Sequence, residues 1–252
     1  MRELTRSVVL GAVVAASSAA PAFGYDPGEG TLLTESFDAE LDADWEMGNG
    51  VGTSPWTRVL DGADEVLYAD GFGPFGGAAT RHWTRHFVHP VAATGFSIAF
   101  EHRAELGAGA LFDVEVEHRS PGLRKLRLRI DGAGAMSLWR TEAGVFVERA
   151  STAAGTVPVD QKRWIRFAIE PDGSGHPWIR ARIWSGNAAA EPTTWTLEFL
   201  DVNDTVETVH RFEIAADGPK GVETWLDDLD VWGDVGDGVA SSVKTIYVAE
   251  LS

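Results

Sequence analysis

Cysteine is absent from the 252 residues of this chain. A disulfide framework, common in exported proteins, is therefore excluded, as is a zinc site built on cysteine. Positive charge is also scarce, because 21 Lys and Arg residues stand against 38 Asp and Glu residues, for a formal net charge of −17. Nucleic acids and anionic membranes attract basic surfaces. We therefore expect neither as a partner, and favour cations or a neutral ligand.

Long apolar segments are missing as well. The longest run, residues 8–20, is shorter than the about 20 residues of a membrane-spanning helix. It follows Arg2 and Arg6 and precedes a cleavage-like stretch of small residues at 20–22, the arrangement of a secretory signal peptide. We predict that residues 1–24 form a cleaved signal and that nothing inserts into a membrane. The mature protein is then secreted, to the extracellular space, cell surface or periplasm, in a bacterium.

Apolar and polar residues alternate along most of the remaining chain, and no helical periodicity is evident. Period two indicates antiparallel strands with one buried face, and turn signals such as Asp131-Gly132 separate the segments. Because sandwiches of this size are commonly single domains, we predict one all-β antiparallel sandwich of jelly-roll type over residues 25–252. The strands are expected at 31–38, 56–60, 65–69, 80–88, 95–103, 110–118, 123–130, 135–140, 145–149, 163–170, 177–185, 194–201, 208–214, 225–232 and 243–250.

One hairpin can be predicted residue by residue. A three-residue loop at 120–122 places acidic residues opposite basic ones, and apolar residues opposite one another on the other face. A slip of one residue would move charge into the core, so the pattern fixes the register. The expected charged pairs are Asp113–Arg129, Glu115–Arg127 and Glu117–Lys125.

Three stretches in the second half carry a family resemblance. Residues 164–170 read Trp-Ile-Arg-Phe-Ala-Ile-Glu, residues 177–184 read Pro-Trp-Ile-Arg-Ala-Arg-Ile-Trp, and residues 225–232 read Trp-Leu-Asp-Asp-Leu-Asp-Val-Trp. Strand, turn, strand and a late strand with paired Asp resemble the concanavalin A-like lectin/glucanase superfamily, in particular LamG-like jelly-roll domains. The resemblance spans about Leu32 to Trp232.

This resemblance implies a function class. The leading hypothesis is a secreted, non-catalytic carbohydrate-binding or adhesive lectin-like module whose partner is a polysaccharide or surface glycan. A glycan hydrolase or lyase of the same fold is one alternative, and a structural surface or coat protein is another. The sequence leaves the particular glycan and the oligomeric state open.

An aromatic and cationic strand face is the candidate ligand site. Trp178, Arg180, Arg182 and Trp184 share one face of a predicted strand. Aromatic rings stack on the C–H surfaces of sugars, and Arg donates forked hydrogen bonds to hydroxyl or carboxylate groups. The alternative is a cation–π arrangement on a surface sheet with no ligand. Other Trp residues are predicted to fill the core, namely Trp45, Trp56, Trp164, Trp195 and Trp232.

Three acids at period two are the catalytic candidates. Asp113, Glu115 and Glu117 resemble the Glu-x-Asp-x-Glu strand of laminarinase-type enzymes in this superfamily, in which one Glu is the nucleophile and the other the acid. The order differs here, since Asp stands at the nucleophile position and Glu at the partner position. The basic strand opposite offers another role, an ion-pair ladder, and we favour the ladder over catalysis.

A structural calcium ion is the predicted metal. Glu35 is in phase with apolar neighbours in the first strand, and Asp227 is in phase with Trp225, Leu229 and Val231. A carboxylate on an apolar face needs a partner or a metal. The resemblance implies one Ca²⁺ between the first and last strands, held by Glu35 and Asp227, with Asp228 replacing Asp227 if a bulge shifts the phase. In the alternative, Arg or backbone amides satisfy these acids.

Overall fold

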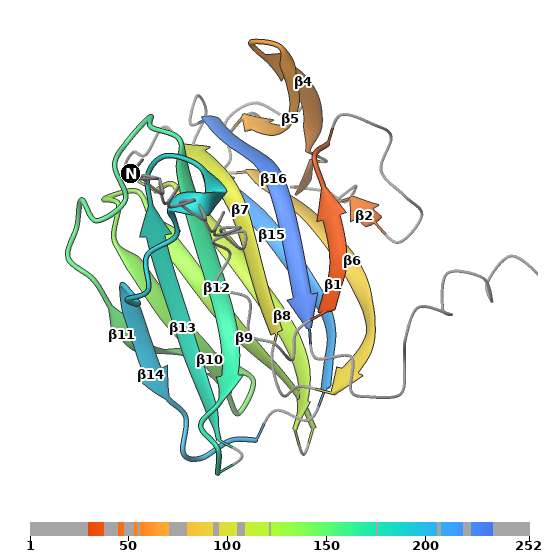
Figure 1. Ribbon diagram of the computed structural model, residues 1–252, viewed down its shortest axis with the longest axis vertical. Helices are drawn as coiled ribbons and strands as arrows, with labels where there is room; N and C mark the ends of the chain where they lie inside the picture. Colours follow the sequence, from red (N-terminus) through yellow and green to blue (C-terminus); the bar gives the residue numbers. More distant parts are fainter. Residues whose placement is uncertain are drawn as a thin grey trace, which may run out of the picture.

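Two β-sheets lie face to face in the computed structural model of the chain (Figure 1). The structure describes residues 30–37, 45–47, 53–54, 56–70, 80–92, 96–104, 109–120, 122–174, 176–205, 208–218 and 223–233. Within these ranges the elements are strands and one short 3-10 helix, η1 (Ala188–Ala190). None of the described helices is long and apolar enough to cross a membrane. The predicted signal at 1–24 and the strand predicted at 243–250 lie outside the described residues.

Sheet A has the strand order β14-β13-β12-β7-β16-β5-β4. The long strand β16 pairs with β7 along one edge, while its other edge pairs first with β5 and then with β1. The β4–β5 hairpin extends beyond the sandwich at the top of the view (Figure 1). The strands of sheet A are β1 (Gly30–Glu35), β4 (Thr57–Asp61), β5 (Asp64–Asp70), β7 (Phe96–Ala104), β12 (Arg163–Pro171), β13 (Pro177–Trp184), β14 (Leu197–Leu200) and β16 (Glu223–Gly233).

Sheet B has the strand order β11-β10-β9-β8-β15-β6-β2. Its pairings are antiparallel except for the short contact between β3 and β6, which is parallel. Strand β15 lies between β8 and β6 and joins the N-terminal part of the chain to the central hairpin. The strands of sheet B are β2 (Trp45–Met47), β3 (Thr53–Ser54), β6 (Thr80–Ala92), β8 (Leu111–Ser120), β9 (Gly122–Asp131), β10 (Met136–Glu142), β11 (Val145–Ser151) and β15 (Thr208–Gly218).

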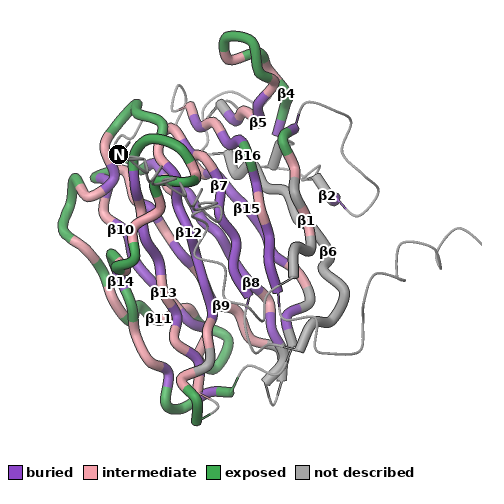
Figure 2. Tube along the Cα trace, viewed as in Figure 1, coloured by how far each residue is buried: buried purple, intermediate pink, exposed green. Residues whose placement is uncertain are grey.

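The core lies between the sheets, where alternate residues of both meet. Figure 2 shows buried residues concentrated along the central strands and exposed ones at the β4–β5 turn and in the connecting loops. Period-two alternation explains this, because every second side chain of a strand points to the same side. Fully buried members of the core include Phe96, Ile98 and Phe100 of β7, Phe112 and Val114 of β8, Leu126 and Leu128 of β9, Ile165 and Phe167 of β12, and Phe212 of β15.

The predicted β8–β9 register is confirmed in every pair. Asp113 lies opposite Arg129, Glu115 opposite Arg127 and Glu117 opposite Lys125. One strand was predicted too long, since β14 begins at Leu197 and not at residue 194. The preceding residues, 185–196, instead connect β13 to β14 across the outer face of sheet A. The short strands β2 and β3 were not predicted.

A β-bulge changes the phase of β16. Asp227 lies opposite Glu101 in the register with β7, and the pairing shifts before it resumes at Asp230. Asp228 adopts a left-handed backbone with φ of 46°, a conformation that Asp tolerates better than most residues. The prediction that Asp227 shares the apolar face with Leu229 is therefore wrong. Leu229 points into the core, whereas Asp227 lies on the outer face of sheet A.

Candidate functional site

The four predicted ligand residues lie together on the outer face of sheet A. In the β12–β13 register, Trp184 lies opposite Trp164 and Arg182 opposite Arg166. Side chains directly opposite one another share a face of the sheet. Because Ile179 and Ala181 of β13 belong to the core, Trp178, Arg180, Arg182 and Trp184 all point away from it. The structure thus brings these four residues together, while their role in ligand binding stays a prediction.

Half of this face is covered by residues 185–196, which we call the strap. Arg182 is 6 % exposed and Trp184 is 7 % exposed. The Trp184 ring stacks on that of Trp164, with 6.0 Å between the centroids, and its Nε1 donates a hydrogen bond to the Asn187 carbonyl at 3.0 Å. A ligand cannot reach Arg182 or Trp184 while the strap lies in this position.

Glu191 is the strap residue that holds two arginines. Its carboxylate accepts hydrogen bonds from Nε and Nη2 of Arg166 at 2.5 and 2.9 Å, and lies 2.5 Å from Nη2 of Arg182. The Glu191 side chain is only 1 % exposed. Burial lowers the pKa of Arg182, Glu191 opposes this shift, and repulsion from Arg166 adds to it. We refer to Arg166 and Arg182 as the Arg pair.

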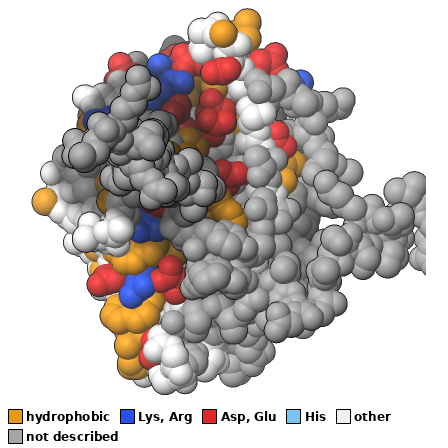
Figure 3. Space-filling view, in the orientation of Figure 1, with side chains coloured by type: hydrophobic (Ala, Val, Ile, Leu, Met, Phe, Trp, Pro, Cys, Tyr) orange, Lys and Arg blue, Asp and Glu red, His pale blue; other side chains and the backbone are white. Residues whose placement is uncertain are grey.

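The other half of the face is partly exposed and forms what we call the Trp–Arg platform, composed of Trp178, Arg180 and Trp195. The Arg180 guanidinium lies 4.7 Å from the Trp178 ring centroid and 5.6 Å from that of Trp195. Ion pairs to Glu170 at 2.5 Å and Glu198 at 3.1 Å hold it in place. Figure 3 shows a basic spot with acidic and hydrophobic side chains beside it at the lower left, over β12–β14.

Several tryptophans were assigned to the wrong environment. Trp45 and Trp56 belong to the core cluster, as predicted. Trp164 and Trp232 are buried on the outer face of sheet A, where the Arg166 guanidinium lies 4.3 Å from the Trp232 ring centroid. Trp195 is half-buried over Arg182, at 4.0 Å. Sequence reasoning therefore missed Trp195 and Glu191 as members of the site. One signal was available, because the Arg pair places like charges opposite one another and demands a third partner.

The catalytic candidates lie on the outer face of sheet B, where each is ion-paired. Arg129 donates two hydrogen bonds to Asp113, at 2.7 and 2.8 Å. Glu115 accepts from Arg127 and also from Lys125, the latter at 3.1 Å. This differs from the predicted ladder at one rung, because Lys125 reaches diagonally to Glu115. Two hydrogen bonds from Arg211 of β15, at 2.9 and 2.6 Å, neutralise Glu117 instead.

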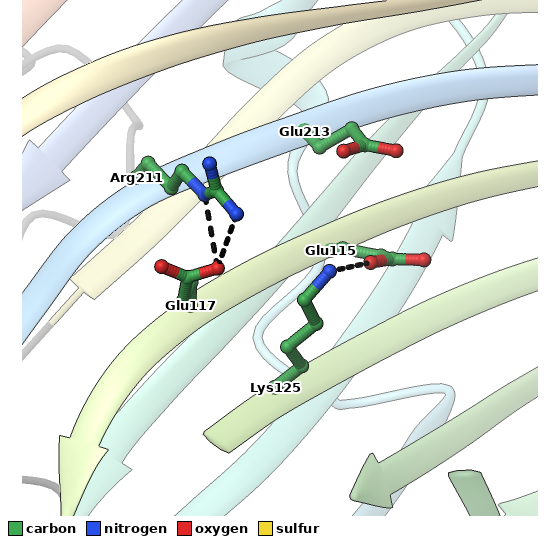
Figure 4. A pocket seen from close by; sticks show the side chains of 5 residues that line it. All are labelled: Glu115, Glu117, Lys125, Arg211 and Glu213. Carbon is green, nitrogen blue, oxygen red and sulfur yellow. Dashed lines mark hydrogen bonds and ion pairs between the residues drawn. The ribbon is translucent and has the colours of Figure 1, made fainter. Parts of the chain in front are cut away.

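A small polar groove lies among these side chains. Its lining consists of Glu115, Glu117, Lys125, Arg211 and Glu213, drawn from β8, β9 and β15 (Figure 4), and its empty volume is about 160 Å³. Pockets for small molecules commonly have roughly 300–1,000 Å³. Burial raises the pKa of Glu115, but attraction and hydrogen bonds from Arg127 and Lys125 outweigh burial, so that the net shift is downward. A carboxyl with a lowered pKa is ionised at neutral pH and cannot act as the acid of a glycosidase.

The predicted calcium ligands do not converge. Glu35 lies opposite Leu229, on the inner side of sheet A, and its Oε1 accepts a hydrogen bond from the Phe37 amide at 2.9 Å. Asp227 lies on the outer side, and Asp228 is exposed. Among the described residues, no group of three or more His, Cys, Asp and Glu residues could hold a metal ion. These three acids therefore do not fit one Ca²⁺.

Asp227 instead belongs to a charged cluster near the β4–β5 hairpin. Lys162 bridges Glu101 at 3.0 Å and Asp61 at 3.3 Å, and Arg103 also pairs with Asp61 at 3.4 Å. Burial raises the pKa of Asp227 to about 7, the charges of Asp228 and Glu101 add to the shift, and the Asp228 amide and Lys162 oppose it. Asp227 is thus the described acid that changes charge near neutral pH.

Comparison with known proteins identifies the fold. No protein-family model matches the chain, and no curated protein matches it in sequence. The carbohydrate recognition domain of Emp47p is a similar solved structure, with 10% identity, a TM-score of 0.53 and coverage of 81% of this chain and 95% of that one. A native glycosidic hydrolase is also similar, with 10% identity, a TM-score of 0.55 and coverage of 81% and 96%. The exoplasmic/lumenal domain of VIP36, in a form bound to Ca²⁺ and Man3GlcNAc, has 9% identity, a TM-score of 0.51 and coverage of 83% and 90%. The chain therefore has a concanavalin A-like jelly-roll fold.

Proposed function

We propose that this protein is a secreted, non-catalytic carbohydrate-binding module that recognises a polysaccharide or surface glycan. The observation that carries the proposal is the Trp–Arg platform, in which two partly exposed indole rings flank a guanidinium. Ring faces stack on the C–H surfaces of a pyranose, and the guanidinium between them donates to its hydroxyls. Because Glu170 and Glu198 already orient Arg180, little side-chain entropy is lost on binding.

The fold supports the same function class. Emp47p contributes a carbohydrate recognition domain, and the VIP36 structure contains a bound glycan. At these identities the likeness extends to the fold alone, so the assignment of glycan binding to this chain depends on its own side chains. The platform meets that requirement because it combines aromatic surface with a hydrogen-bond donor at an accessible site.

The test is glycan binding by the purified mature chain on an array and in polysaccharide pull-down. We expect Trp178→Ala to weaken binding at least about tenfold, the loss of one stacked ring, with no reducing sugar released by either protein. Trp139→Ala is the matched control, because Trp139 is a half-buried indole on the outer face of sheet B. Equal binding by Trp178→Ala and the wild type, or a loss confined to Trp139→Ala, would refute the platform as the site.

The second candidate is a glycan hydrolase or lyase of the same fold. The groove on sheet B favours it, because three carboxylates from two strands line one hollow, and a glycosidic hydrolase is among the similar structures. Release of reducing sugar by the wild type, abolished by Glu117→Gln, would establish catalysis and displace the leading proposal. The ion pairs of Asp113, Glu115 and Glu117 favour a structural ladder.

A further inference from the structure

The Arg pair beneath the strap has the composition of a carboxylate receptor. Two guanidiniums, each nine-tenths or more buried, share the single carboxylate of Glu191. Arg166 uses its planar fork on that carboxylate, and its Nη1 donates to Ser97 Oγ at 2.9 Å. Arg182 spends one nitrogen on Glu191 and another on the Pro192 carbonyl at 2.6 Å. Its Nε is buried without a hydrogen-bond partner, so the receptor has an unused donor.

The strap is held mainly by the carboxylate that fills this receptor. Glu191 is the one charged residue among residues 185–196. Helix η1 within the strap contributes no buried residue, and Asn187 at its N-terminus makes no side-chain capping bond. The remaining ties are hydrogen bonds to the Asn187 and Pro192 carbonyls and the bond from the Thr196 amide to Ala181. Exchange of Glu191 for another carboxylate would thus release the strap with little loss of apolar contact.

We propose that the strap is a displaceable lid, and that the Arg pair binds the carboxylate of an acidic, uronate-containing polysaccharide once Glu191 has left. This inference rests on the proposed function and names its ligand class. Glu191 acts as an internal mimic of the uronate carboxylate. Aromatic rings surround the receptor, since Arg166 lies over Trp232 and Arg182 over Trp195. Those walls suit a sugar ring better than an acidic peptide.

Charge and energetics agree with an exchange mechanism. A buried guanidinium without its carboxylate is strongly destabilised, so the Arg pair requires an anion or water at every stage. A uronate replaces the forked, charge-assisted bonds of Glu191 and can also use Arg182 Nε. The net charge of −17 repels a polyanion at long range, but screening confines that repulsion to about 8 Å at physiological salt. Selection of the ligand then depends on these contacts.

The first experiment compares two forms of one polymer. Binding of polygalacturonate and of its methyl ester is measured by isothermal titration calorimetry at fixed salt, because esterification removes the carboxylates and leaves the sugar chain intact. We expect the acid form to bind at least about tenfold more tightly, with free galacturonate as a competitor. Equal affinity for the two forms overturns the proposal. Equally tight binding of poly-glutamate would assign the receptor to acidic peptides and also overturns it.

Variants then isolate the lid. If the strap covers the receptor more than nine-tenths of the time, Glu191→Gln should tighten polygalacturonate binding by about tenfold, because the apparent affinity scales with the open fraction. Arg182→Met should remove the preference for the acid form. The matched control is Glu65→Gln, which also removes one negative charge but from a hairpin pair with Arg58 at 3.1 Å. The same tightening in Glu65→Gln would show a long-range charge effect and overturn the lid.

A measurement on the wild type keeps the inference testable if a variant fails to fold. Hydrogen–deuterium exchange of the strap amides should rise when polygalacturonate binds, including that of Thr196, whose amide is bonded to Ala181. Unchanged or slower exchange of the strap in the bound state contradicts displacement. The proposed function fails separately, when Trp178→Ala leaves binding of neutral glycans unchanged.

Discussion

The outer faces of the two sheets solve the same electrostatic problem in different ways. On sheet B, β8 supplies acids and β9 supplies bases in direct register, so that Asp113 meets Arg129 within one hairpin. On sheet A, the register of β12 and β13 places Arg166 opposite Arg182, and the neutralising carboxylate of Glu191 comes from a loop. Like charges directly opposite one another are destabilising. The comparison teaches that a like-charge pair in register signals a third partner elsewhere in the chain.

Removal of that third partner is expected to have the largest effect. Glu191→Ala leaves two buried guanidiniums without a carboxylate, and breaking a buried ion pair commonly costs about 3–5 kcal/mol. We expect a loss of about 3 kcal/mol in the free energy of unfolding, at the low end because a lifted strap would hydrate the Arg pair. Urea denaturation followed by Trp fluorescence measures it.

The control for Glu191→Ala lies on sheet B. Glu117→Ala removes a carboxylate whose partner, Arg211, keeps 24% of its side chain exposed and remains partly hydrated. Its cost should be about 1 kcal/mol. If both variants lose the same stability, the two faces do not differ in the way described here.

The same contrast explains which parts of the molecule could be predicted from sequence. The β8–β9 register was predictable because local alternation and complementary charge within one hairpin agree with each other. The bulge at Asp228 was not, since one residue in a left-handed conformation shifts every later side chain to the opposite face. Asp227 was placed on the apolar face for that reason. Glu191 and Trp195 were missed because no local pattern shows where a loop will fold, although the Arg pair itself can be inferred from the register.

The pH dependence of stability should separate the faces further. The folded-state pKa of Asp227 on sheet A is raised from 3.8 to about 7. The native state therefore holds a proton that the unfolded state has lost, and stability falls as pH rises from about 4 to about 7. Asp227→Asn keeps the neutral form at every pH. We expect it to stabilise the protein by about 2 kcal/mol at pH 8 and by little at pH 4. Thermal melts across this range measure the difference, and an equal effect at both pH values would contradict it.

The smallest expected effect concerns Glu115 on sheet B, whose pKa is shifted in the opposite direction. Arg127 and Lys125 hold its folded-state pKa below the ordinary value of 4.5, against the opposing effect of burial. Its contribution to stability is therefore present above pH 4.5 and is lost as pH falls through the lowered pKa. Glu115→Gln should cost about 1 kcal/mol at pH 7, because its partners stay partly hydrated, and the cost should shrink toward pH 3. Melts of wild type and variant at the two pH values measure this change. A cost that grows in acid would mean that the carboxyl is protonated in the native groove, which would revive its role as a catalytic acid.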